Sequence, residues 1–186
     1  MKKIFLLLVL VCSFSYGQET EFKFTKDGLT DFVVIDCPGK TQAELYKKAL
    51  DWVLVTYKNP NEVLKAKIEN DYIRIDGASS GLILQYILGM PMEFTGKYTT
   101  EIFFKEGKFK FDITALGYYH PGSKYGAGVE VDILNGSMSD YFRKDETIRA
   151  TFKKYPEKFS SEFNGLTASL KEFVMSDKIP SKKSDW

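Results

Sequence analysis

The short motif GASSG, Gly77 to Gly81, is the part of this 186-residue sequence whose spacing could support catalysis. It matches the G-x-S-x-G pattern that places a nucleophilic serine, here Ser79, on a sharp turn between a strand and a helix. Asp112 and His120 follow in the order that serine hydrolases of this kind use, with the histidine as base and the aspartate orienting its ring. A serine hydrolase that uses Ser79, Asp112 and His120 is therefore one hypothesis.

The surroundings of this motif favour a different interpretation. Such a nucleophile requires a mainly parallel sheet, whereas Asp112 lies in a segment whose alternation predicts an antiparallel hairpin. Small residues after a strand are also typical of a turn or bulge. We therefore expect Ser79 to be a loop residue and the protein to be non-catalytic.

Metal and cofactor chemistry has little support in the sequence. His120 is the only histidine, which excludes a histidine-rich metal site. Cys37 has no thiol or histidine near it in sequence to activate it, so we expect a small, buried, apolar residue. The segment HPGSKYGAG lacks the Gly-Lys-Ser/Thr ending of a phosphate-binding loop. We expect no metal and no other cofactor.

The N-terminal stretch MKKIFLLLVLVCSFSYGQ has the organisation of a secretory signal peptide. Two lysines precede an apolar run over residues 4–11, which is far shorter than the ~20 residues of a transmembrane helix. We expect cleavage after Gly17, which leaves a periplasmic or secreted protein with no transmembrane segment in its mature chain. A lipoprotein acylated at Cys12 is disfavoured, because Val11 before it is not a small residue.

Loss of this leader changes the charge of the chain. Removal of Lys2 and Lys3 lowers the number of basic residues from 26 to 24, while the 25 acidic residues remain. The formal net charge therefore changes from +1 to −1. No general positive field remains for nucleic-acid binding, and export argues against that partner as well. With Cys37 as its single cysteine, the mature chain has no intramolecular disulfide. We expect one domain over residues 18–176 and a disordered tail over residues 177–186.

Two helices are predicted at opposite ends of this domain. Thr41 and Glu44 form a capping box at the start of the first, and Asn59-Pro60 ends it. A short helix carrying Ile148, Phe152 and Tyr155 is predicted to be interrupted by Pro156. The last helix then has an apolar stripe formed by Phe159, Phe163, Leu166, Leu170 and Phe173 or Val174.

Alternation predicts the strands. Asp27-Gly28 indicates a hairpin between the segment with Phe22 and Phe24 and the apolar run 32–35. In VLKAKI we expect Leu64, Ala66 and Ile68 on the covered side and both lysines on the other, and VEVDIL is also strand-like. A two-residue turn at Glu106-Gly107 predicts a long hairpin in which Lys105 faces Lys108. The facing pairs that follow are Phe104 with Phe109, Ile102 with Phe111, Thr100 with Ile113 and Tyr98 with Ala115.

The order strand, helix, four strands, helix resembles a secreted bacterial family known as a domain of unknown function with TBP-like fold. The residues that carry the resemblance are GKTQAELYKKALDWV (39–53), IRIDG (73–77) and YTTEIFFKEGKFKFDIT (98–114). It covers roughly residues 30–118 and implies an α+β fold, a curved antiparallel sheet with helices on one face. It implies no catalytic residues, and residues 119–156 can depart from the common plan.

One face of the predicted sheet is polar and uncovered, and we expect it to bind a partner. Its five basic residues are opposed by three acidic ones, Asp76, Glu101 and Asp112, so its excess of positive charge is too small for DNA binding. The basic saddle and apolar wedges of a DNA-bending sheet are also missing. The expected partner is an envelope protein, a glycan or a small ligand. The candidate binding residues are Lys65, Lys67, Tyr72, Arg74, Lys97, Phe103 and Lys110.

The segment SGLILQYILGMPMEF, residues 80–94, is unusually apolar. We expect Leu82 to Leu88 to continue a strand or to pack on the domain, with Gly89-Met90-Pro91 as the following turn. The alternative is an exposed patch over residues 82–92, which would make the protein membrane-apposed or supply its partner surface. The run is too short to span a bilayer as a helix.

Overall fold

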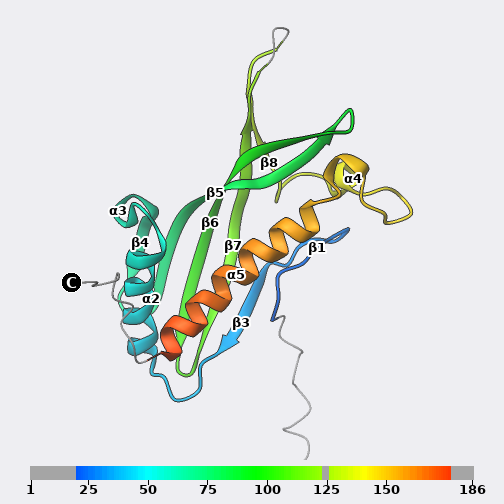
Figure 1. Ribbon diagram of the computed structural model, residues 1–186. Helices are drawn as coiled ribbons and strands as arrows, with labels where there is room; N and C mark the ends of the chain where they lie inside the picture. Colours follow the sequence, from blue (N-terminus) through cyan, green and yellow to red (C-terminus); the bar gives the residue numbers. More distant parts are fainter. Residues whose placement is uncertain (1–19, 123–125, 177–186) are drawn as a thin grey trace, which may run out of the picture.

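The computed structural model describes residues 20–122 and 126–176 (Figure 1). The predicted signal peptide, the alternative lipid anchor Cys12 and the predicted disordered tail lie outside the described residues, as do three residues of the HPGSKYGAG segment. Within the described part of the chain, a single hydrophobic cluster joins the sheet to the helices.

A six-stranded antiparallel sheet forms the centre of the molecule (Figure 1). Its strand order is β3-β7-β6-β5-β4, and β8 pairs with β7 beyond the end of β3. This arrangement confirms the predicted α+β fold with a curved antiparallel sheet. The strands are β3 (Phe32–Asp36), β4 (Leu64–Ile68), β5 (Tyr72–Ile87), β6 (Met90–Lys105), β7 (Lys108–His120) and β8 (Val129–Asp132).

Helix α2 (Gln42–Thr56) lies on one face of the sheet (Figure 1). The predicted capping box is confirmed: the Glu44 backbone N–H donates to the Thr41 hydroxyl at 3.2 Å, and the Thr41 backbone N–H donates to the Glu44 carboxylate at 2.8 Å. Trp52 is buried, and its indole N–H donates to the Ser169 hydroxyl at 3.0 Å. The helix ends at Thr56, and Pro60 begins the short helix α3 (Pro60–Val63).

Helix α5 (Tyr155–Met175) runs across the same face (Figure 1). The predicted apolar stripe is confirmed, with Phe159, Phe163 and Leu170 fully buried. The expected interruption at Pro156 is wrong, because this proline lies in the first turn of α5, where no intrahelical donor is lost. In place of the predicted short helix, the chain has α4 (Met138–Tyr141) and the 3₁₀ turn η2 (Ala150–Phe152), and Tyr155 belongs to α5.

The N-terminal segment fills the remaining gap beside α5. Phe22 is fully buried, with its ring 6.1 Å from that of Phe111 and 5.8 Å from that of Phe163. Asn164 holds the backbone of Phe22 in place: its Oδ1 accepts from the Phe22 N–H at 2.7 Å and its Nδ2 donates to the Phe22 carbonyl at 3.1 Å. The segment therefore completes the core of the sheet and the long helix.

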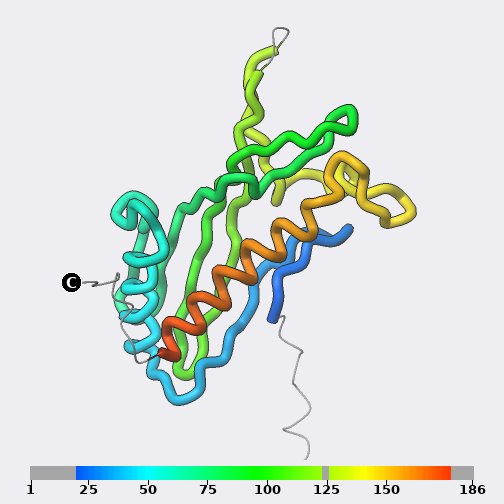
Figure 2. The backbone as a smooth tube through the Cα atoms, in the orientation of Figure 1, coloured from blue at the N-terminus to red at the C-terminus, as the bar shows by residue number. Residues whose placement is uncertain are grey.

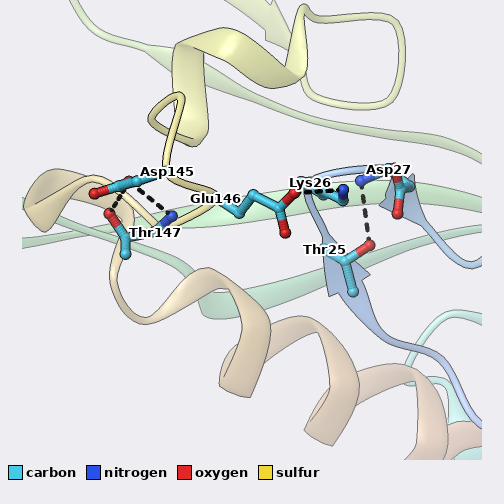
Figure 3. Close-up of polar contacts among 6 residues, drawn as sticks. All are labelled: Thr25, Lys26, Asp27, Asp145, Glu146 and Thr147. Atoms are coloured by element: carbon cyan, nitrogen blue, oxygen red, sulfur yellow. Dashed lines mark hydrogen bonds and ion pairs between the residues drawn. The ribbon is translucent and has the colours of Figure 1, made fainter.

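A small hairpin follows, formed by β1 (Phe24–Thr25) and β2 (Gly28–Leu29). Thr25 faces Gly28, so the turn is Lys26-Asp27, one residue earlier than predicted. The predicted return strand is also wrong, because the run 32–36 pairs with β7. Figure 3 shows how this hairpin contacts the loop before η2, through an exposed ion pair of 2.7 Å between Lys26 and Glu146.

The β6–β7 hairpin confirms most of the predicted register. Four of the five predicted pairs form, from Lys105 with Lys108 to Thr100 with Ile113. Thr99 then faces Ala115, which leaves Thr114 as an extra residue in a β-bulge. Beyond this bulge Tyr98 faces Leu116, so the predicted pair with Ala115 is wrong by one residue.

Strand β4 also contains a register shift. Leu64 faces Ile75 but Ala66 faces Arg74, which leaves Lys65 as the extra residue. Since facing residues share one side of the sheet, Ile68 lies with Tyr72 on the uncovered side and Lys67 with Ile73 on the helix side. The predicted sides of Ala66, Ile68 and Lys67 are therefore wrong.

Candidate functional site

The helices leave one face of the sheet uncovered, and we call it the open face. The cross-strand register arranges its side chains in rows, because residues directly opposite one another point to the same side. One row contains Phe32, Asp112, Glu101, Arg74 and Ala66, and the next contains Val34, Lys110, Phe103, Tyr72 and Ile68. These rows bring residues from five strands onto one surface.

Aromatic and charged groups alternate in the centre of this surface. Tyr72 donates a hydrogen bond of 2.9 Å to the Glu101 carboxylate, and its ring centre lies 5.0 Å from that of Phe103. Desolvation, followed by the hydrogen bond to Glu101, raises the pKa of Tyr72. Arg74 Nε lies 3.9 Å from Glu101 Oε1. Tyr72 and Arg74 thus share one carboxylate, which holds both side chains against the sheet.

Lys110 lies between two phenylalanine rings. Its Nζ is 4.3 Å from the ring centre of Phe103 and 5.0 Å from that of Phe32, and it forms an ion pair of 2.9 Å with Asp112. Phe32 is 42% exposed, so this contact is accessible from outside. Its contacts with the two aromatic faces hold the Lys110 ammonium group in place.

A depression of about 380 Å³ adjoins this cluster. Phe103 and Val34 supply its apolar part, while the charges come from Lys105, Lys108 and Lys110. Lys105 and Lys108 face each other across the β6–β7 hairpin, a like-charge arrangement that is unfavourable by itself. Asp36 faces Lys108 from β3, but no carboxylate of the described residues forms an ion pair with either lysine. We call this depression the lysine pocket, and its chemistry suits an anionic group beside an apolar one.

A second, wider groove of about 540 Å³ lies further along the open face. Small residues form its floor, including Ala78, Ala115 and Gly117, and a Cβ at Gly117 would lie 2.4 Å from the Val131 carbonyl oxygen. Its rim is mainly acidic and is formed by Asp76, Lys97, Glu130 and Asp132. The two concave areas of the open face therefore have opposite charge.

The residues predicted to bind a partner are only partly brought together. Tyr72, Arg74, Phe103 and Lys110 form the central cluster. Lys97 lies in the acidic groove, where it pairs with Glu130 at 3.3 Å. The bulge places Lys65 at the sheet edge and turns Lys67 to the other side.

Sequence reasoning missed several residues of the open face. Lys105 and Lys108 could have been found, because both lie two residues along their strands from predicted members of this face. Phe32 and Val34 could not, since nothing local indicates that β3 pairs with β7. Ile68 was assigned to the wrong side because the bulge was not recognised.

The structure does not bring the residues of the hydrolase hypothesis together. Ser79 lies within β5, not on a strand-to-helix turn, and its hydroxyl donates to the Glu162 carboxylate at 3.1 Å. Asp112 binds Lys110, and His120 Nδ1 lies 2.8 Å from the Pro121 carbonyl oxygen. The three side chains thus have separate partners on different parts of the sheet.

The remaining candidates from the sequence are a reactive cysteine and a metal site. Cys37 is fully buried, and desolvation raises the pKa of its thiol, which disfavours the reactive thiolate. Across residues 20–122 and 126–176, no group of three or more histidine, cysteine, aspartate or glutamate side chains is arranged to hold a metal ion. No helix in these described residues is long and apolar enough to cross a membrane.

Comparison with known families agrees with this architecture. Residues 32–119 match the family model described as a domain of unknown function (DUF4468) with TBP-like fold. The likeness to the DUF4468 family therefore covers just under half of the chain. The matched segment runs from β3 to the end of β7, so it contains the whole central cluster and the lysine pocket but not β8 or α5.

Solved structures extend the likeness beyond the DUF4468 segment. A crystal structure of a DUF4468 family protein from Bacteroides ovatus ATCC 8483 has a TM-score of 0.62 and 12% identity, over 80% of this chain and 86% of that chain. A crystal structure of a TBP-like protein from Parabacteroides distasonis ATCC 8503 has a TM-score of 0.53 and 11% identity, over 79% and 92%. At such identities the likeness shows the fold alone. No curated protein sequence matches the chain.

Proposed function

We propose that this chain is an exported, non-catalytic binding domain of the bacterial cell envelope, and that the lysine pocket of its open face takes a ligand with an anionic group. The observation that supports the proposal best is the pair of facing lysines, Lys105 and Lys108, beside exposed aromatic surface. A like-charge pair lowers stability unless an anion shares it. Export is proposed from the N-terminal leader.

The geometry of the pocket narrows the ligand class. Phe103 and Val34 offer an apolar wall next to the ammonium groups, which favours a ligand whose carboxylate, sulfate or phosphate adjoins an apolar or planar part. Lys110 is already paired with Asp112 and contacts two aromatic rings, so its ammonium group stays in place without a ligand. Lys105 and Lys108 are the cations that a ligand would neutralise.

Nucleic acid does not fit this surface as well. The acidic groove formed around Asp76, Glu130 and Asp132 lies on the same face, so a long polyanion following the sheet would meet negative charge. A small anion, or a single acidic group of a glycan or protein, would occupy the lysine pocket without reaching that groove.

The test is affinity enrichment from envelope extracts, with bound proteins, glycans and small molecules identified by mass spectrometry. The test variant is Lys105→Glu with Lys108→Glu. The control is Lys47→Glu with Lys58→Glu, which makes the same change in charge at two exposed positions away from the open face. We expect the control to retain the ligands of the wild type and the test variant to lose them. Identical sets for all three proteins would contradict the proposal.

A further inference from the structure

The outer parts of β5 and β6 form a hairpin that leaves the sheet (Figures 1 and 2). Its pairs run from Ile83 with Phe94 to Ile87 with Met90, beyond a register shift that follows Ser79. Strand β7 pairs with β6 only as far as Gly96, so the hairpin has no third strand. We call residues 86–92 the hairpin tip.

The base of this hairpin is firmly packed. Leu82, Ile83 and Leu84 are buried, and the Gln85 side-chain amide donates to the hydroxyls of Tyr118 at 2.5 Å and Tyr155 at 2.7 Å. The prediction of a packed strand is therefore confirmed for this half of the apolar segment. A rigid base means that the tip is held at a defined position relative to α5.

The hairpin tip is exposed and apolar. Leu88 is 94% exposed, Met90 65% and Met92 40%. Ile87 and Met90 face one side of the hairpin, whereas Tyr86 and Pro91 face the other, so neither side is polar. The expectation of a packed segment is wrong for this half. No residue from 86 to 92 carries a charge.

Backbone conformation adds a second observation. Leu88 and Gly89 form the turn, with φ angles of 51° and 82°, so the predicted turn at Gly89-Met90-Pro91 is also wrong. Two positive φ angles are typical of a type I′ turn, in which asparagine followed by glycine is preferred. A leucine at such a φ is strained, and this side chain is almost completely exposed. Folding of the domain does not explain a leucine here.

From these observations we propose that the hairpin tip inserts into the surface of a lipid bilayer. A convex tip that is apolar on both sides can be surrounded by acyl chains. In the pair Tyr86 with Pro91, next to the turn, backbone N–H groups would point outward from the hairpin, where another strand could accept them. Proline has no N–H group, so pairing of this edge with another strand is disfavoured at Pro91. The same absence of an outward donor lowers the cost of entering a non-hydrogen-bonding medium.

The base of the tip carries charges of both signs, with Glu93 next to Met92 and two lysines where α5 begins. Lys153 Nζ lies 3.9 Å from the ring centre of Tyr86, and Lys154 follows it at the start of α5. Tyrosine and lysine at the boundary between an apolar tip and a charged base are typical of the membrane interface. Glu157 pairs with Lys154, so Lys153 is the principal cation of this group.

The test is flotation of the protein, lacking its leader, with vesicles of phosphatidylglycerol and phosphatidylethanolamine, and separately with vesicles of phosphatidylcholine. The variant Leu88→Asn replaces the exposed apolar side chain by a polar one, and asparagine tolerates the positive φ of this turn better than leucine does. The matched control, Leu54→Asn, removes a 56% exposed leucine from α2. We expect Leu88→Asn to lower the partition coefficient roughly tenfold and the control to leave it unchanged.

Lys153→Gln tests the charged base of the tip. We expect it to weaken flotation with the anionic vesicles severalfold at low salt, and to have little effect with phosphatidylcholine. Failure of the wild type to float with either vesicle, or equal flotation of Leu88→Asn, would overturn the proposal. So would a dimer that Leu88→Asn dissociates in sedimentation experiments without vesicles, because a second copy would then be the occupant. None of these outcomes bears on the lysine pocket.

Discussion

The β6–β7 hairpin and the tip of the β5–β6 hairpin are both joined by two-residue turns with glycine second, yet their surroundings differ. The first has β5 and β3 on its flanks, helices over one side, and polar residues on the other. The second has no flanking strand and is apolar on both sides. A hairpin inside the sheet is stabilised by its own domain, whereas the exposed tip has side chains that the domain does not use.

The largest test of this difference is truncation of one apolar side chain from each hairpin, buried in the first and exposed in the second. Phe111 is fully buried against Phe22 and faces Ile102, so Phe111→Ala is expected to lower the free energy of unfolding by about 3–5 kcal/mol. Met92→Ala at the tip is expected to change it by less than about 0.5 kcal/mol. Urea denaturation measures both. Similar losses would show that the tip is packed in solution.

Alkaline pH should destabilise the aromatic cluster beside the base of the tip, where the Tyr141 ring lies 5.9 Å from that of Tyr155. Burial raises the pKa of Tyr141 to about 12, and that of the neighbouring Tyr155 still further. Because these pKa values in the folded state lie above the usual value of about 10, the stability that the protonated tyrosines contribute is fully present below pH 10. It is lost as the pH rises through 12. The loss attributable to Tyr141 is on the order of 2 kcal/mol.

Denaturation curves between pH 9 and 12 for the wild type and Tyr141→Phe measure this effect. We expect the variant to lose less stability across that range, because phenylalanine has no proton to release. Parallel curves for the two proteins would contradict the assignment.

The amide that joins the base of the tip to the core should have an intermediate effect. Gln85→Leu leaves the buried hydroxyls of Tyr118 and Tyr155 without their donor, which is expected to cost about 1–3 kcal/mol. Hydrogen exchange should then accelerate from Ile83 to Phe94 while the β6–β7 pairs stay protected. Uniform acceleration in both hairpins would mean that they unfold together.

Leu88→Asn should change stability in the opposite direction. Asparagine tolerates the positive φ at this position, so the variant is expected to gain about 0.5–1 kcal/mol, or a few degrees in Tm. Differential scanning calorimetry measures the change, with Leu54→Asn as the control. A loss of stability would indicate that Leu88 packs within the folded domain.

The smallest effect is expected in the turn region of the β6–β7 hairpin. Lys105→Glu replaces the like-charge pair with Lys108 by an opposite-charge pair, so stability should rise by about 0.2–1 kcal/mol at low salt. Thermal unfolding at low and high salt would measure it, and the gain should shrink as salt increases. A loss of stability at low salt would show that Lys108 is already neutralised by a neighbouring group.

The comparison also shows how far local patterns reach. The alternation between Ile102 and Phe111 and the capping box at Thr41 were predicted correctly, because each depends on residues adjacent in the chain. The open face was found in outline, since Tyr72, Arg74, Phe103 and Lys110 follow from the same alternation. The lysine pocket was not predicted, because half of its apolar wall is Val34 in β3. The partner of β3 is β7, which lies about 75 residues away in sequence.

By itself, the sequence determined the local elements of this protein: the helix starting after Thr41, the tight turn at Glu106-Gly107 and the polar side of the central strands. Only the tertiary structure decided the rest. The bulges at Lys65 and Thr114 reverse the sides of the residues that follow them, because side chains alternate with a period of two. Likewise, where β7 stops pairing with β6 decides which part of the apolar segment is buried and which forms the exposed tip.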